Sequence, residues 1–170
     1  IKIRGDQVAV IEVRKLEKYD TEVAQRVREL LVELSRSGKD KGEIAKQWFL
    51  DIIDSPWHDL LIAYDGEEIL GMATVSVIMG AGIRKNIYLE DFVVDAAARG
   101  KGAGGLIWEA VLKWGREHGA KRLEFTCGQG REAAQAFYKD HGAEIYDTNF
   151  LRVELEQRCG RTGNIYGKLD

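Results

Sequence analysis

Three strand-like apolar runs follow one another in the middle of the chain, and they constrain the fold more than any other feature. They cover residues 60–64, 69–79 and 87–94. Asp65-Gly66 stands between the first two runs and is typical of a tight hairpin turn. Residues 80–86 are expected to form a loop before the third run. Since strands joined by short turns pair antiparallel, the sequence predicts an antiparallel group within one sheet.

Helices and further strands flank this group. Before it we expect a strand over 8–13, a helix capped by Asp20 and a second helix that ends before Pro56. The first helix is predicted from the helical spacing of Val23, Val27, Leu30, Leu31 and Leu34, and the second from that of Ile44, Trp48 and Ile52.

The chain after residue 105 is expected to alternate between helices and strands. Leu106, Ile107, Ala110, Val111 and Trp114 are predicted to line one face of a helix. We then expect a strand over 122–127, a helix over 132–141 and strands over 143–146 and 151–155. This order predicts an α/β fold of the α+β kind, in which helices cover a mixed sheet. One domain is expected over 1–156, with a polar tail or arm over 157–170.

Composition excludes several classes of function. The formal net charge of -3 argues against a nucleic-acid binder. No apolar run approaches the roughly 20 residues that span a bilayer, so no membrane partner is expected. The two cysteines, Cys127 and Cys159, have no metal-site spacing, and we expect reduced thiols and no metal. With no signal-peptide core after Ile1, a cytoplasmic location is the expectation.

The sharpest feature is the glycine-rich segment 99–105, between the strand 87–94 and an amphipathic helix. Glycines let the backbone turn so that its N–H groups converge with no side chain in the way. The helix N-terminus adds unpaired donors and partial positive charge, and Arg99 and Lys101 add full charges. The segment therefore predicts a site for a phosphate or pyrophosphate group.

Two pyrophosphate motifs overlap in this segment. Gly100, Gly102 and Gly105 satisfy the dinucleotide fingerprint GxGxxG, and Arg99, Gly102 and Gly104 satisfy the coenzyme A signature (Q/R)xxGx(G/A). The first motif belongs to the first βαβ unit of a parallel sheet, but an antiparallel hairpin comes first here and little chain follows. The coenzyme A motif is therefore favoured. The remaining alternative is a glycine loop with a purely structural role and no ligand.

The (Q/R)xxGx(G/A) signature is that of the GCN5-related N-acetyltransferases, and the resemblance extends over residues 87–143. The segments 88–94, 99–104 and 136–139, then Gly142-Ala143, follow one another as in spermidine/spermine N-acetyltransferase-like members. The resemblance implies a mostly antiparallel mixed sheet with helices on both faces. Its central parallel strands, 87–94 and 122–127, are expected to splay and hold acetyl-coenzyme A between them.

Acetyl transfer to an amine makes three chemical demands. The acceptor amine must lose a proton, the tetrahedral oxyanion needs a donor, and the leaving thiolate needs a proton. The resemblance assigns the first role to Glu90, as base or as a holder of a cationic substrate, and the third to Tyr138. The backbone N–H of Val93 or Val94 is the expected oxyanion donor. The plainer alternatives are an exposed or salt-bridged carboxylate for Glu90 or Asp91, and a core tyrosine for Tyr138.

The resemblance also implies a set of cofactor-binding residues. Arg131 stands where relatives often carry Asn, and Ala103 where many carry an aliphatic residue. The full expected set is Phe92, Val93, Val94, Arg99, Gly100, Lys101, Gly102, Ala103, Gly104, Gly105 and Arg131.

The leading functional hypothesis is an acetyl-coenzyme A-dependent amine N-acetyltransferase. Its acceptor is expected to be a primary amine. The candidates are a small-molecule amine, such as a polyamine, an amino acid or an aminoglycoside-like drug, and a peptide such as a protein N-terminus. A homodimer is compatible with these features. The alternatives are a catalytically inactive acetyl-coenzyme A sensor and a dinucleotide-binding protein.

Overall fold

The computed structural model describes residues 10–35, 37–40, 42–82, 84–153 and 155. The chain divides into two compact units, residues 1–125 and 126–168, and each is described by itself. The expected domain over 1–156 stays a prediction, and the expected tail over 157–170 lies outside the described residues.

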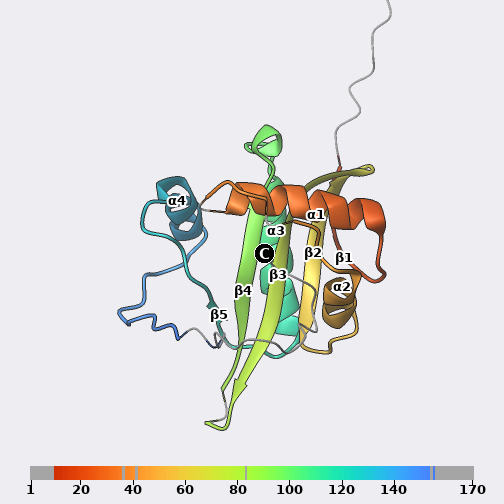
Figure 1. The fold of residues 1–170 in the computed structure, drawn as a ribbon. Helices are drawn as coiled ribbons and strands as arrows, with labels where there is room; N and C mark the ends of the chain where they lie inside the picture. Colours follow the sequence, from red (N-terminus) through yellow and green to blue (C-terminus); the bar gives the residue numbers. More distant parts are fainter. Residues whose placement is uncertain (1–9, 36, 41, 83, 154, 156–170) are drawn as a thin grey trace, which may run out of the picture. The chain divides into compact units, whose positions relative to one another are not determined.

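The first unit contains a five-stranded sheet in the order β1-β2-β3-β4-β5 (Figure 1). Its strands are β1 (Ile11–Lys15), β2 (His58–Asp65), β3 (Glu68–Gly80), β4 (Arg84–Val94) and β5 (Leu123–Glu124). The first four pair antiparallel, whereas β4 and β5 pair in parallel. Gly66 has φ 63°, as a tight β2–β3 turn requires. The predicted mixed, mostly antiparallel sheet is therefore confirmed.

Helices cover both faces of this sheet. On one face lie α1 (Thr21–Leu34), whose first turn is capped by Asp20, and α2 (Lys46–Ile53). Their buried side chains form one core cluster with Leu60 and Ile62 of β2. Asp59, the residue before Leu60, instead accepts a hydrogen bond from Trp114 Nε1 of α3 (Ala103–Glu117). Because successive strand residues face opposite ways, α3 lies on the other face, as Figure 1 also shows.

The α3 helix packs close to β3 and β4 because glycines remove side chains at two contacts. A Cβ on Gly71 would lie 3.1 Å from Ile107 Cδ1 of α3, as well as 2.6 Å from the Val93 backbone oxygen of β4, and one on Gly115 would lie 2.5 Å from Ile87 Cδ1. Leu106 departs from the predicted apolar face and is 44% exposed, since it projects from the solvent side of α3. None of the helices among the described residues combines the length and the apolar character needed to cross a membrane.

The second unit contains α4 (Glu132–Asp140), close to its predicted bounds, and Gly142 follows it with φ 85°. The strands predicted over 143–146 and 151–155 are wrong for the residues described there, which have no strand assignment. Leu151, Val153 and Leu155 are at least 80% exposed. Alternation of apolar and polar residues produces a strand only where a partner edge is available, and in the described residues none pairs with this segment.

Candidate functional site

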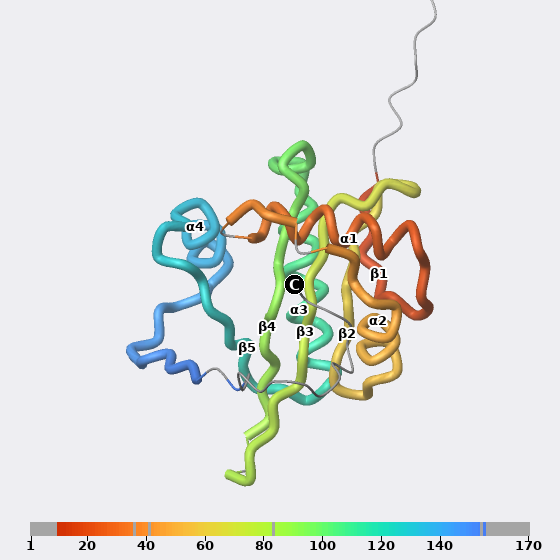
Figure 2. Tube along the Cα trace, in the orientation of Figure 1, coloured from red at the N-terminus to blue at the C-terminus, as the bar shows by residue number. Residues whose placement is uncertain are grey.

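The glycine-rich loop connects the end of β4 to the start of α3. After Val94 comes the short 3-10 helix η1 (Ala96–Ala98), and Gly100 and Gly102 then have φ 78° and 91°. Such angles favour glycine, and a Cβ on either residue would have no heavy atom within 4 Å. These glycines therefore serve the backbone conformation and leave open space beside it. Figure 2 traces this loop in green, beyond the end of β4.

Five backbone N–H groups of the loop have no acceptor among the described residues. They belong to Gly100, Gly102, Ala103, Gly104 and Gly105, and the last three open α3. The first N–H groups of a helix lack intrahelical acceptors, and the helix dipole gives that end partial positive charge. The loop therefore presents a concentrated set of donors for an anionic group.

Apolar side chains at both ends of the loop are buried in the core and hold its backbone in place. Ala103 is 1% exposed and packs in a cluster with Leu70 and Ala98, so its side chain belongs to the core and only its N–H faces the loop. Asp95 caps η1 by accepting the backbone N–H of Ala97. The loop is thus held in its donor-rich conformation without any ligand.

The two cationic side chains of the loop differ in their contacts. The guanidinium of Arg99 donates from Nε to the backbone oxygen of Val94 at 3.1 Å and from Nη2 to Glu33 at 2.8 Å. Lys101 is exposed and forms no ion pair with any described residue. Both charges lie at the loop that carries the unpaired N–H groups.

Among the described residues, no strand pairs with the second half of β4 on its β5 side, and this edge is called the open edge below. The pairing of β4 with β5 covers only Ile87 and Tyr88, which agrees with the predicted splayed pair. The backbone N–H of Asp95 bonds to Leu70 on β3. Because antiparallel ladders alternate, we infer that Val93 also points to β3, whereas Phe92 and Val94 present their N–H groups to the open edge. This alternation favours Val94 over Val93 as an N–H donor there.

Glu90 is the extra residue of a β-bulge. Thr74 pairs with Asp91 and the next residue, Val75, pairs with Leu89, so Glu90 has no partner on β3. Bulges re-aim side chains and are common next to active sites. The surrounding protein partly desolvates Glu90, and the Asp91 carboxylate lies nearby, so the pKa of Glu90 is raised. His58 opposes this rise in pKa.

His58 stands at the start of β2 and was not predicted as a site residue. It is exposed, and its Nδ1 lies 2.8 Å from Ser55 Oγ. His58 pairs with Ser76 of β3, and Ser76 pairs with Tyr88 of β4, two residues before Glu90, so the strand register brings residues 58 and 90 to one part of the sheet. No spacing in the sequence relates residues 58 and 90, so only the pairing of three strands could reveal this neighbour.

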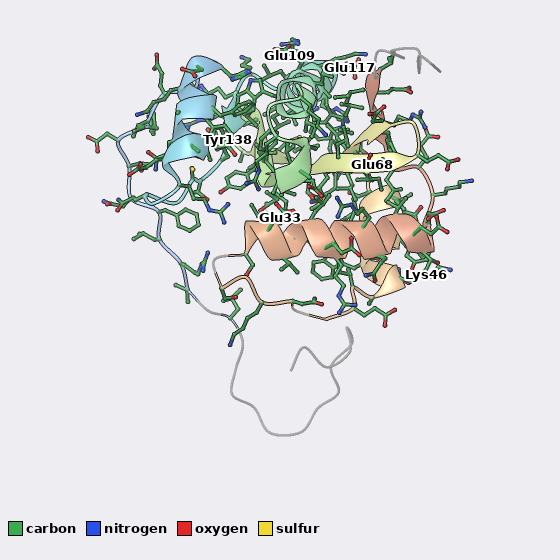
Figure 3. All side chains as sticks on the ribbon, turned by 90° about the horizontal axis from the view of Figure 1, so that it is seen from above. Glu33, Lys46, Glu68, Glu109, Glu117 and Tyr138 are labelled. Atoms are coloured by element: carbon green, nitrogen blue, oxygen red, sulfur yellow. The ribbon has the colours of Figure 1, made fainter. Side chains whose placement is uncertain are left out.

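Tyr138 and Arg131 belong to the second unit, whereas Glu90 and the loop belong to the first. Tyr138 is partly buried on α4 (labelled in Figure 3), and its ring meets the Phe137 ring edge-on at 5.7 Å. Burial and nearby Cys127 raise the pKa of Tyr138 to about 12, although Arg131 opposes the shift. Its phenol therefore stays protonated at neutral pH and can serve as an acid. Arg131 stands at the N-cap position of α4.

Comparisons with known proteins identify the family of this chain. The model of the acetyltransferase (GNAT) family matches residues 24–143. Two proteins of Bacillus subtilis (strain 168) named as uncharacterized N-acetyltransferases are each 32% identical to this chain: YobR over 91 residues and YhfO over 97. These matches cover 54% and 56% of this chain, but only 35% of YobR and 64% of YhfO.

A solved structure shares the fold. It is that of AAC(6')-Iy in complex with the bisubstrate analogue CoA-S-monomethyl-acetylneamine, with a TM-score of 0.68 and 18% sequence identity. The match covers 88% of this chain and 99% of that one.

Proposed function

Since this chain belongs to the acetyltransferase (GNAT) family, we propose that it transfers the acetyl group of acetyl-coenzyme A to an amine. The observation that carries this proposal is the set of five N–H groups, in the loop and the first turn of α3, that have no acceptor among the described residues. They follow the edge of β4 that β5 leaves uncovered. A pyrophosphate has many acceptor oxygens and two negative charges, so it fits such a set of donors. Arg99 and Lys101 add charge at the same place.

The residues of β4 supply what the first half of the reaction needs. Glu90 accepts a proton from the ammonium of the acceptor, directly or through one water, which frees the nitrogen lone pair. The nitrogen then attacks the thioester carbon, a C–N bond forms and the carbonyl oxygen becomes an oxyanion. Backbone N–H groups on the open edge of β4, that of Val94 among them, stabilise this oxyanion.

Tyr138 supplies what the second half needs. As the C–S bond breaks, its hydroxyl gives a proton to the departing thiolate. The nitrogen gives its remaining extra proton to the resulting tyrosinate, directly or through one water, so the amide is released with the neutral thiol of coenzyme A and the phenol is restored. A pKa of about 12 keeps that proton in place until the thiolate develops. Loop residues 99–105 hold the pyrophosphate throughout, and Arg131 is proposed to contact the cofactor from the start of α4.

We further propose that the acceptor is a primary amine. Two neighbouring carboxylates, Glu90 and Asp91, favour a substrate that arrives as a cation. A polyamine, an amino acid and a protein N-terminus all meet this description, and so does an aminoglycoside. The bisubstrate analogue bound to AAC(6')-Iy joins coenzyme A to an acetylneamine, so this fold accommodates both groups in that protein.

Two measurements test the proposal. Acetyl-coenzyme A at about 100 times its Kd should add about 2.7 kcal/mol of stability and raise the Tm by about 5–11 °C. NAD at the same concentration should leave the Tm unchanged, because the loop is not part of a dinucleotide fold. Thiol release is then followed across a panel of a polyamine, amino acids, an aminoglycoside and a peptide with a free N-terminus. Stabilisation without release on any amine would indicate a sensor, and no stabilisation would refute the proposal.

A further inference from the structure

Side chains of α1 form ion pairs and hydrogen bonds with residues 95–99, which lead into the glycine-rich loop. Arg26 and Glu33 are seven residues apart, about two turns, and therefore lie on the same side of the helix. Arg26 forms an ion pair with Asp95 and also donates to the backbone oxygen of Ile69. Glu33, labelled near the end of α1 in Figure 3, accepts from the backbone N–H of Ala96 at 3.1 Å and from Arg99 at 2.8 Å.

The contacts of Arg99 leave part of its guanidinium available. An arginine has five N–H donors in a fixed planar fork. Arg99 uses Nε for the Val94 oxygen and Nη2 for Glu33, and Nη1 has no acceptor among the described residues. Its side chain is 60% exposed, and that of Glu33 is 30% exposed. The plane of the guanidinium is therefore fixed at two atoms while its remaining donors stay open to a ligand.

We propose that Glu33 is a positioning residue for acetyl-coenzyme A, because it holds the Arg99 guanidinium in place for the pyrophosphate. This inference rests on the proposed function. The side chain of Arg99 is long and has many rotamers. Holding such a side chain in one conformation before the ligand binds is worth about 2- to 10-fold in affinity. The same carboxylate also fixes the Ala96 N–H, so it orders the backbone just before the loop.

A competing possibility gives the opposite sign. If Glu33 only occupies Arg99 in the place of a phosphate, its removal would free the cation and tighten cofactor binding. The contacts favour positioning for two reasons. Arg99 keeps donors that Glu33 does not use, and Glu33 also accepts from the Ala96 N–H, a contact that a mere substitute for phosphate would not need.

The test measures the Kd of acetyl-coenzyme A by calorimetry on the full chain. Glu33→Ala should weaken binding about 2- to 10-fold, and Glu33→Gln, which keeps an acceptor for both partners, should restore most of the loss. The matched control is Glu22→Ala, which removes the same charge from α1 at a carboxylate that forms no ion pair with any described residue and should leave the Kd unchanged. In an Arg99→Ala background, Glu33→Ala should have no further effect on affinity.

Kinetics separate positioning from a general loss of structure. The KM for acetyl-coenzyme A should rise in Glu33→Ala, while kcat at saturating cofactor and the Tm stay close to those of the wild type. Should Glu33→Ala fail to fold, Glu33→Asp shortens the side chain by one methylene, which withdraws the carboxylate from Arg99 and Ala96, and should also raise KM. Unchanged or tighter binding in the folded variants would overturn this inference alone. A wild-type chain that does not bind acetyl-coenzyme A would overturn both it and the proposed function.

Discussion

Replacing Gly102 with Asp should abolish measurable binding of acetyl-coenzyme A while leaving the chain folded. Gly102 has φ 91° and stands directly before α3, next to the unpaired N–H groups of Ala103 and Gly104. No heavy atom lies within 4 Å of a Cβ built on Gly102, so the new side chain would meet no atom of the protein. It would instead occupy the space that we assign to the pyrophosphate.

The expected magnitude has two parts. A non-glycine residue in the left-handed region costs roughly 1–2 kcal/mol, which corresponds to a fall in Tm of about 2–8 °C for a chain of this size. The carboxylate then repels the phosphates. At about 5 Å and an effective dielectric constant of about 20, each unit of charge contributes about 3 kcal/mol, or more than about 100-fold in Kd.

The matched control is Gly66→Asp in the β2–β3 turn. Gly66 has φ 63° and equally open space around its Cα, so this variant has the same backbone cost without any proposed ligand. Calorimetry should find wild-type affinity in Gly66→Asp and no binding in Gly102→Asp, with similar Tm values for both. A Kd within about threefold of wild type in folded Gly102→Asp, against the 100-fold expected, would refute the assignment of the loop.

Three further substitutions test the rest of the site and the fold. Because the pKa of Glu90 is raised, its carboxyl group ionises at higher pH than usual, and wild-type kcat/KM should rise with pH as this group ionises; Glu90→Gln should remove this rise and lower activity. Tyr138→Phe should lower kcat by about 10²–10⁴-fold with little change in Tm or cofactor affinity. Gly71→Ala forces a Cβ to 2.6 Å from the Val93 oxygen and should lower the Tm by about 2–12 °C through a cost of about 1–3 kcal/mol.

Each of these expectations has a result that contradicts it. A pH profile of kcat/KM that is the same for Glu90→Gln and wild type from about pH 5 to 9 would exclude Glu90 as the base. A fall in kcat of less than about threefold in Tyr138→Phe, below the general-acid range, would leave water as the acid. An unchanged Tm in Gly71→Ala would mean that β3 and β4 can separate there without cost.

Features set by neighbouring residues were predictable from the sequence. Asp20 caps α1, Asp65-Gly66 turns between β2 and β3, and Gly100 and Gly102 of the loop adopt positive φ. In each case a few adjacent residues determine the backbone conformation, through a side-chain acceptor or the absence of a Cβ. The phosphate-binding hypothesis came from the same kind of local information.

Features that depend on the exact register or the side-chain contacts of distant segments were not predictable. The bulge at Glu90 exists only because Val75 pairs with Leu89 and not with Glu90. The contact between Glu33 and Arg99 joins residues 66 positions apart, and Glu33 alone resembles any solvated helix carboxylate. The strand predicted over 151–155 fails for the same reason, since alternation in its sequence cannot supply a partner.

Because the loop is anchored from outside, its own sequence can consist largely of glycine. Binding through backbone N–H groups requires a fixed backbone, yet glycine is the residue least able to fix one. The rigidity must therefore come from outside the loop. Here it comes from α1, through the pairs Arg26–Asp95 and Glu33–Arg99, and from Ala103 buried beneath the loop. A substitution that loosens either ion pair should accordingly weaken cofactor binding while every donor of the loop remains present.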